Sequence, residues 1–211
     1  MIDVNKLTRP QDIRVDLRLI AEMVEPGSRV LDVGCAEGTL LDYLVATKNV
    51  DGRGIELSQE GVNTCVAKGL SVVQGDADTD LVDYPDHAFD YALLSQTLQA
   101  THRPKDVIDQ LLRVGKKAVV SFPNFAYWQC RAYLIFKGRM PMTSDLDYAW
   151  YETPNIHFCT LRDFTVLCQE LNITIDEYVL VGGKGNILNY EVDSTRANLF
   201  AAQGVFLLSR D

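Results

Sequence analysis

Apolar residues change their spacing in a regular order along the first part of the chain. Between residues 10 and 25 they recur every three or four positions, which is typical of a helix with one apolar face. Residues 29–34 form a short, mostly apolar run like a buried strand, and residues 39–47 return to the helical spacing. The pattern predicts a helix, a strand, a glycine turn and a second helix in succession.

The same alternation continues downstream. Two further helices are predicted, one from Ser58, a typical N-cap residue, to Gly69, and one from Pro104 to Gly115. The strands predicted around them are residues 52–56, 70–74, 89–94 and 118–122. This order predicts an α/β, Rossmann-like fold, with a mostly parallel sheet and helices on both faces.

The last third of the chain is less regular. An aromatic helix follows Asn124, and a loop is expected over residues 137–154. Thr160 and Asp163 have the spacing of a capping box and predict the start of another helix. Residues 173–181 and 199–208 then predict a C-terminal antiparallel strand pair. Since no repeat or linker is visible, residues 1–211 are expected to form a single domain.

Composition narrows the class of protein. The 211 residues carry 20 Lys and Arg against 29 Asp and Glu, and the resulting charge of -9 disfavours binding to nucleic acid. The apolar runs are of strand length, and the first 18 residues mix acids and bases, so neither a membrane span nor a signal peptide is predicted. Five widely spaced cysteines and three separate histidines form no local metal motif. We expect a cytoplasmic protein that binds no nucleic acid, membrane or metal.

Residues 30–38 carry the first chemical signal. This Val-Leu-Asp-Val-Gly-Cys-Ala-Glu-Gly segment lies at a predicted strand-to-helix turn, where free helix N–H groups favour a nucleotide-like ligand. A dinucleotide-binding turn has the pattern G-x-G-x-x-G, but Ala36 and Thr39 occupy its second and third glycine positions. The pattern G-x-A-x-G therefore favours a different cofactor.

Two acidic residues at strand ends extend this signal. Glu56 ends the second strand, where a carboxylate suits the two hydroxyls of a ribose, and Asp76 follows the third, where it suits an adenine amine. The carboxyl ends of parallel strands meet at one edge of a sheet, so the three features together predict a nucleoside site. Taken singly, each also has a structural interpretation, as a turn or a solvated cap.

Residues 29–122 resemble class I S-adenosylmethionine-dependent methyltransferases, whose first motif has this acidic strand and glycine turn. The resemblance implies a methyltransferase-like domain and S-adenosylmethionine or S-adenosylhomocysteine as cofactor. The middle glycine common in that turn is Ala36 here, and its methyl group is expected to crowd the ligand. The candidate cofactor-binding residues are Asp32, Gly34, Cys35, Ala36, Gly38, Glu56, Leu57, Asp76, Ala77 and Ser95.

A second resemblance covers nearly the whole chain. The strings LSQTLQA (94–100), SFPNF (121–125), GRMP (138–141), WYETPNIH (150–157) and NLFA (198–201) are similar to those of the bacterial methionine biosynthesis family MetW. This resemblance implies a role in methionine synthesis and a link to the homoserine O-acyltransferase MetX as partner. Neither the pathway nor the partner follows from the chemistry of the residues.

The sequence assigns no catalytic residue. Residues 95–97 lack the Asn/Asp-Pro-Pro-aromatic signature of amino-group methyltransferases, and His102 and His157 are either bases or structural residues. Ser121 and Asn124 either donate into the cleft or cap the following helix.

The aromatic residues Tyr148, Trp150 and Tyr151 allow three interpretations: a lid over an acceptor pocket, a protein-binding patch, or a loop packed on the sheet edge.

Three functions remain open. The first is a methyltransferase-like protein that binds S-adenosylmethionine and supports homoserine acylation by binding the acyltransferase. The second is a small-molecule methyltransferase with an unknown acceptor, and the third is a structural subunit that binds no ligand.

Overall fold

A computed structural model describes residues 13–143, 146 and 148–210. The predicted first helix, residues 10–25, is partly outside the described residues. The helices are α1 (Val15–Met23), α2 (Thr39–Lys48), α3 (Gln59–Ala67), α4 (Pro104–Val114), α5 (Trp128–Lys137), α6 (Leu161–Glu170) and α7 (Thr195–Phe200), with short 3-10 turns η2 (Asp80–Asp83) and η3 (Leu98–Ala100). The strands are β1 (Arg29–Val33), β2 (Asp51–Glu56), β3 (Ser71–Gln74), β4 (Phe89–Ser95), β5 (Gly115–Pro123), β6 (Thr174–Gly182), β7 (Ile187–Leu188) and β8 (Ala201–Ser209).

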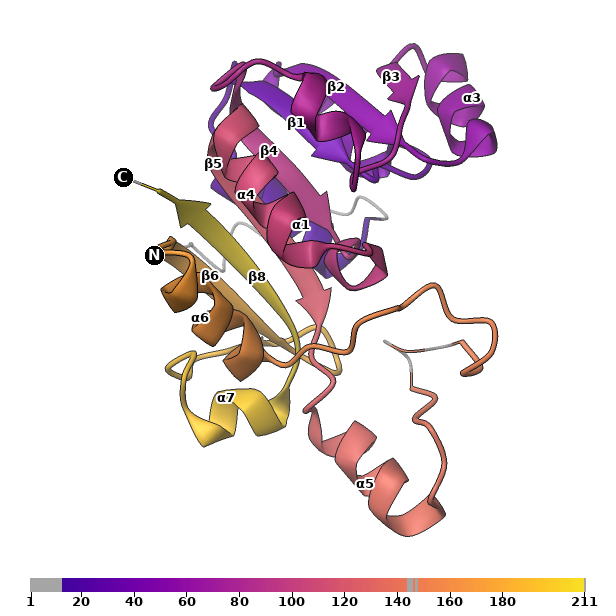
Figure 1. The fold of residues 1–211 in the computed structure, drawn as a ribbon, viewed down its shortest axis with the longest axis vertical. Helices are drawn as coiled ribbons and strands as arrows, with labels where there is room; N and C mark the ends of the chain where they lie inside the picture. Colours follow the sequence, from indigo (N-terminus) through magenta and orange to yellow (C-terminus); the bar gives the residue numbers. More distant parts are fainter. Residues whose placement is uncertain (1–12, 144–145, 147, 211) are drawn as a thin grey trace.

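In the part of the chain that the structure describes, the strands form one sheet in the order β3-β2-β1-β4-β5-β8-β6-β7 (Figure 1). Strands β1 to β5 are parallel, as the alternating pattern predicts. The predicted α/β fold class is confirmed.

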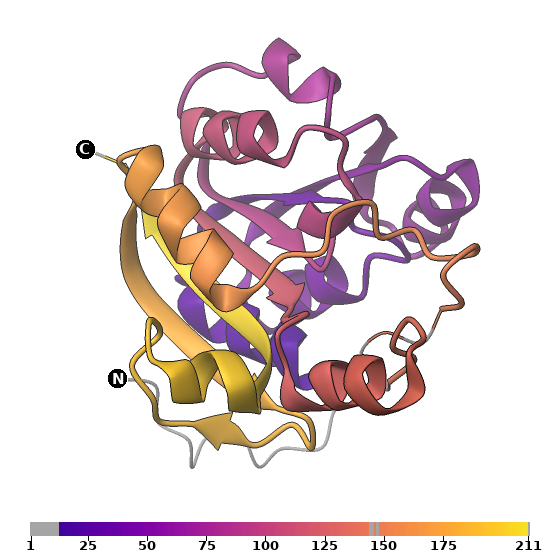
Figure 2. The same cartoon turned by 60° about the horizontal axis from the view of Figure 1, so that its bottom comes forward.

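Helices cover both faces of the sheet (Figure 2). Alternate residues of β1 point to opposite sides: Leu31 and Val33 pack in the cluster that includes α4 and α6, whereas Val30 packs in the cluster that includes α1 and α2. Strand β1 pairs in parallel register with both β2 and β4, so the carboxyl ends of the three strands lie side by side. The apolar side chains on the two faces of the sheet pack this arrangement in place.

The predicted C-terminal strand pair is present, with one error. Strands β6 and β8 are antiparallel, and β8 also pairs with β5, so it lies between them. Leu199 and Phe200 were expected in the last strand, but they end helix α7 instead. The reason is local: the Ser194 side chain accepts a hydrogen bond from the amide of Ala197 and caps a helix that the apolar run alone did not reveal.

The five cysteines carry free thiols, of which only Cys159 is partly exposed; the other four are buried. Within the described ranges no helix has the length and apolar character needed to cross a membrane. In the same ranges no group of three His, Cys, Asp or Glu side chains is arranged to hold a metal ion.

Candidate functional site

The turn between β1 and α2 adopts left-handed backbone at three positions. Gly34 has φ +72° and Gly38 has φ +75°, and Ala36 between them has φ +50°. A Cβ atom at Gly34 would also lie 2.7 Å from Oγ1 of Thr97. Both the backbone conformation and the close approach of the Thr97 side chain, just after β4, therefore favour glycine at position 34, and Ala36 is a strained residue.

Glu56 at the end of β2 fixes this turn. Its carboxylate accepts one hydrogen bond from the amide of Ala36, at 2.8 Å, and another from the amide of Ser58, at 2.9 Å. The amides of Gly34 and Cys35 donate to the carbonyl of Ile55. These turn amides are already bonded within the protein, contrary to the expectation that the turn offers free N–H groups. Each Glu56 oxygen still has a second acceptor position.

A cavity of about 540 Å³ opens beside the turn, within the range of about 300–1,000 Å³ that is usual for small-molecule sites. The walls come from the turn, from the end of β4 and from α1. The lining residues are Ile13, Arg14, Leu17, Asp32, Gly34, Cys35, Ala36, Glu37, Thr39, Leu40, Ser95, Gln96 and Thr97. The structure thus brings together five of the predicted cofactor-binding residues, namely Asp32, Gly34, Cys35, Ala36 and Ser95.

Asp32 is the buried acid of the cavity. It is 2% exposed, and its Oδ1 atom has no hydrogen-bond partner among the described residues. Burial, together with the negative charge of Glu56, raises the pKa of Asp32 to about 7. A buried carboxyl group with an unused oxygen favours a ligand that brings a positive charge or a donor to this wall.

Helix α1 contributes residues that the sequence did not point to. Arg14 lines the cavity, and its guanidinium donates to both carboxylate oxygens of Asp16, at 3.1 and 2.9 Å. Helix α2 begins without a side-chain cap, because its N-cap residue is Gly38. No sequence signal identifies Arg14, since it lies 20 residues before Gly34 and only the packing of α1 brings it there.

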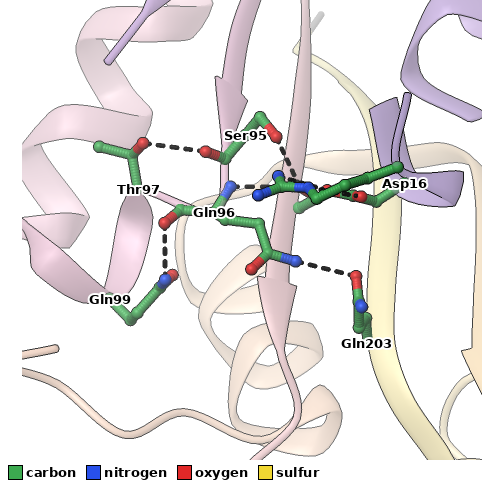
Figure 3. Close-up of polar contacts among 8 residues, drawn as sticks. Asp16, Ser95, Gln96, Thr97, Gln99 and Gln203 are labelled. Atoms are coloured by element: carbon green, nitrogen blue, oxygen red, sulfur yellow. Dashed lines mark hydrogen bonds and ion pairs between the residues drawn. The ribbon is translucent and has the colours of Figure 1, made fainter. Parts of the chain in front are cut away.

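The end of β4 is held by a polar network (Figure 3). Gln96 has φ +52°, and its side-chain amide donates to Oε1 of Gln203 at 2.8 Å. The side chain of Gln99 donates to the carbonyl of Gln96 at 2.6 Å, and the hydroxyl of Thr97 donates to the carbonyl of Ser95 at 2.9 Å. A strained residue held by its neighbours at a cavity wall is typical of a functional site.

Five other candidates lie outside the lining of this cavity: Gly38, Glu56, Leu57, Asp76 and Ala77. Asp76 accepts a hydrogen bond from the amide of Asp78, and Leu57 is exposed. The amide of Gly75 donates to the carbonyl of Glu56, which keeps the ends of β2 and β3 together beside the turn. The role of these five residues in binding adenosine stays a prediction.

The candidate catalytic residues do not reach the cavity lining either. Nε2 of His157 lies 3.4 Å from the carbonyl oxygen of His102, and both histidines are outside the lining. The Ser121 hydroxyl accepts from the amide of Gln96 and donates toward Ser95, while Asn124 is buried and bonded to backbone groups. Asn124 thus serves the fold and does not donate into the cavity.

The fold and the glycine turn define the class of S-adenosylmethionine-dependent methyltransferase folds. A solved S-adenosylmethionine-dependent methyltransferase from Thermotoga maritima is 17% identical to this chain, with a TM-score of 0.63. The match covers 93% of this chain and 88% of the Thermotoga chain. The [4+2]-cyclase SpnF has a TM-score of 0.65 at 18% identity, over 92% of this chain and 80% of its own. Because the fold carries different chemistries, it does not by itself define an activity.

Within this class, the chain belongs to the family of the methionine biosynthesis protein MetW, whose family model matches residues 14–208. The bifunctional methionine biosynthesis protein MetXA/MetW of Rhodopirellula baltica is 37% identical over 181 residues. That match covers 81% of this chain but 29% of the Rhodopirellula protein. The rest of the bifunctional protein has no counterpart in this chain.

Proposed function

We propose that this protein binds S-adenosylmethionine or S-adenosylhomocysteine in the cavity beside the glycine turn and supports homoserine O-acylation by binding the acyltransferase MetX. One observation carries the partnership: in the Rhodopirellula relative, a MetW part and a MetXA part are joined in one bifunctional protein. Proteins that are fused in one organism commonly bind each other where they occur as separate chains.

The residues of the cavity suit the chemical groups of an adenosyl amino acid. Asp32, with its unpaired oxygen, would pair with the ligand's ammonium group, and the guanidinium of Arg14 would face its carboxylate. Glu56 is outside the lining but bonded to Ala36 of the turn, and its remaining acceptor positions suit the ribose hydroxyls. When bound, S-adenosylmethionine supplies an electrophilic methyl group on a sulfonium centre.

Methyl transfer to a small molecule is the second candidate function. It is favoured by the pKa of Asp32, which at about 7 suits a group that accepts a proton at neutral pH. Against it, no histidine lies among the residues lining the cavity. A subunit that binds no ligand at all is the third candidate.

Two measurements separate these functions. Calorimetric titration with S-adenosylmethionine and with S-adenosylhomocysteine at pH 8, where Asp32 is ionised, is expected to give saturable binding. Adding this chain to purified homoserine O-acyltransferase is expected to increase the rate of acyl transfer and to give a complex on size exclusion.

The outcomes are distinct. The chain is instead a small-molecule methyltransferase if it binds the ligand, methylates a candidate acceptor and has no effect on the acyltransferase. Absence of ligand binding with a stable complex would leave only the structural subunit.

A further inference from the structure

Several large apolar side chains of α5 and of the loop after it are exposed, among them the following five. In α5, Trp128 is 45%, Ile135 is 75% and Phe136 is 84% exposed. In the loop, Trp150 and Tyr151 are 72% and 70% exposed, and their rings meet edge to face at 5.6 Å. We call these five residues the docking surface. Exposed aromatic and apolar side chains of this size are typical of an interaction site.

Helix α5 is weakly attached to the rest of the described chain. It lies at the bottom of Figure 1, beyond the carboxyl end of β5. Of its ten residues, all described, Cys130 alone is buried. A helix this short is marginal on propensity and is usually stabilised by burying an apolar face. Its partners in the small core beneath it are Tyr127, Leu146 and Ala202.

The exposed residues of α5 form a face of their own. Trp128, Ile135 and Phe136 stand at positions i, i+7 and i+8, which lie on the same side of a helix. An apolar stripe in this arrangement normally packs against another element. In the described part of the chain none covers it, because these side chains remain exposed.

The loop is continuous with α5 and does not enclose a ligand pocket. Phe125 and Phe158 stack at 4.4 Å beneath it, and Leu146 joins them to the core under α5. The cavity lined by Phe125, Leu146 and Trp150 holds about 20 Å³, far below the size of a small-molecule site. A cavity this small argues against a lid over an acceptor. The alternative of a loop that only packs on the sheet does not explain why Trp150 is exposed.

The charge around α5 is opposite to that of the whole chain. Residues 124–143 contain three basic residues, Arg131, Lys137 and Arg139, and no acidic residue, in a chain of net charge -9. The loop around Trp150 and Tyr151, in contrast, carries Asp145, Asp147 and Glu152. A partner that fits the α5 part of the docking surface therefore offers apolar pockets beside acidic side chains, since interfaces match charge of opposite sign.

We infer that the docking surface is the place where the homoserine O-acyltransferase binds. The inference rests on the proposed function, because the fused relative is what identifies the partner. The acyltransferase supplies the apolar cover that α5 lacks, and the part of its contact face that meets α5 is acidic. An apolar helix flanked by basic residues is also typical of peripheral membrane binding, so the test includes lipid.

The test measures binding of purified acyltransferase from the same organism to the full chain, to Phe136→Ala, to Ile135→Ala and to Trp150→Ala. Each substitution is expected to weaken binding about thirtyfold or more, as truncation of an anchor residue does. Titration with S-adenosylhomocysteine should stay within about threefold, because none of these residues lines the cavity with Asp32. Amide hydrogen exchange in α5 is expected to slow when the partner is added.

The matched control is Val66→Ala, which truncates an exposed apolar side chain on α3 and should leave partner binding unchanged. If wild type binds and all three variants bind equally well, the surface is elsewhere and the inference is wrong, while the proposed function stands. If wild type does not bind the acyltransferase at all, the proposed function fails. The chain is also sedimented with vesicles of equal phosphatidylserine and phosphatidylcholine. If it binds these vesicles and Phe136→Ala does not, the surface binds a membrane and the inference is overturned. If the chain self-associates and Phe136→Ala does not, the surface binds a second copy and the inference is overturned.

Discussion

At the scale of single residues, the site combines groups that are unfavourable for folding. Asp32 is a carboxyl group buried in the sheet, and Ala36 and Gln96 adopt left-handed backbone without being glycine. Such features persist where the surrounding structure holds them in place, here through Glu56 and the network at the end of β4. For Asp32, Ala36 and the supporting Glu56, measurable consequences follow.

The buried carboxyl group of Asp32 should make stability depend on pH. Its pKa is raised from 3.8 to about 7, so the fold keeps a proton that the unfolded chain releases between these values. This contribution to the free energy of unfolding is fully present below about pH 4 and is lost as pH rises to 7, by on the order of 2–4 kcal/mol. Asp32→Asn should remove that dependence in urea unfolding at pH 5 and 8. An equal difference between wild type and variant at both pH values would contradict the raised pKa.

Glu56→Ala should weaken ligand binding by roughly 1.5–3 kcal/mol, because it removes a charged acceptor for the ribose hydroxyls. The structure adds a second consequence, since the amides of Ala36 and Ser58 lose their acceptor and the turn becomes less stable. Calorimetry measures the affinity, and thermal unfolding shows how much of the chain remains folded. Glu60→Ala, on the exposed side of α3, is the control that should change neither. Unchanged affinity in Glu56→Ala would remove this residue from the site.

Ala36→Gly should stabilise the chain by about 0.5–1 kcal/mol. The substitution relieves a left-handed alanine, which costs about 1–2 kcal/mol, and part of the gain is offset by the greater freedom of glycine in the unfolded chain. The same exchange at Ala46, in the exposed interior of α2, should destabilise by about 1 kcal/mol. Urea titrations measure the change in the free energy of unfolding for both variants. A gain at position 36 with a loss at position 46 would establish the strain, and equal losses at both positions would disprove it.

At the scale of elements, short polar signals decide where helices begin. The predicted capping box of α6 is confirmed: the Thr160 hydroxyl accepts from the amide of Asp163, and the Asp163 side chain accepts from the amide of Thr160. The helix then places Leu161 and Phe164 in the main core, so the cap also fixes which face of α6 meets the sheet.

Thr160→Ala should therefore lower the free energy of unfolding by about 1 kcal/mol, measured by urea denaturation. Thr160→Ser keeps the hydroxyl group and should lose much less. An equal loss in both variants would mean that the methyl group of Thr160, and not the cap, carries the contribution.

At the scale of the whole molecule, Asn124 connects elements that are far apart in sequence. Its side-chain nitrogen donates to the carbonyls of Asn198 and Ala201, at 3.0 and 2.8 Å, and its oxygen accepts from the amide of Ala126 at 3.1 Å. The end of β5 is thereby joined to α7 and β8, directly before α5 and the docking surface. This residue is 1% exposed, so no water is available to replace the lost bonds.

Asn124→Ala is expected to destabilise the chain by about 3 kcal/mol, because it leaves several buried backbone groups without partners. It should also weaken acyltransferase binding, since α5 loses its attachment to the end of the sheet. Asn63→Ala, at an exposed position on α3, should stay within about 0.5 kcal/mol of wild type in the same denaturation experiment. A small loss in Asn124→Ala would show that water or neighbouring groups replace its bonds.

The sequence by itself determined the order of elements up to β5, the glycine turn, the start of α6 and the family. The structural features depend on local signals, namely apolar periodicity, glycine at a left-handed position and a capping residue, which act over a few neighbouring positions. The family is recognised from distinctive sequence strings such as WYETPNIH (150–157). The same local signals failed at Leu199 and Phe200, where one short apolar run fits either a strand or the end of a helix.

Only the tertiary structure decided which of these residues share one site. It placed Arg14, directly before α1, in the cavity wall, left Asp76 outside the lining, inserted β8 between β5 and β6, and exposed Ile135 and Phe136. Each of these outcomes depends on contacts between segments distant in sequence, and on whether anything packs over a side chain. A periodic apolar pattern shows that a face should be buried, but not what buries it.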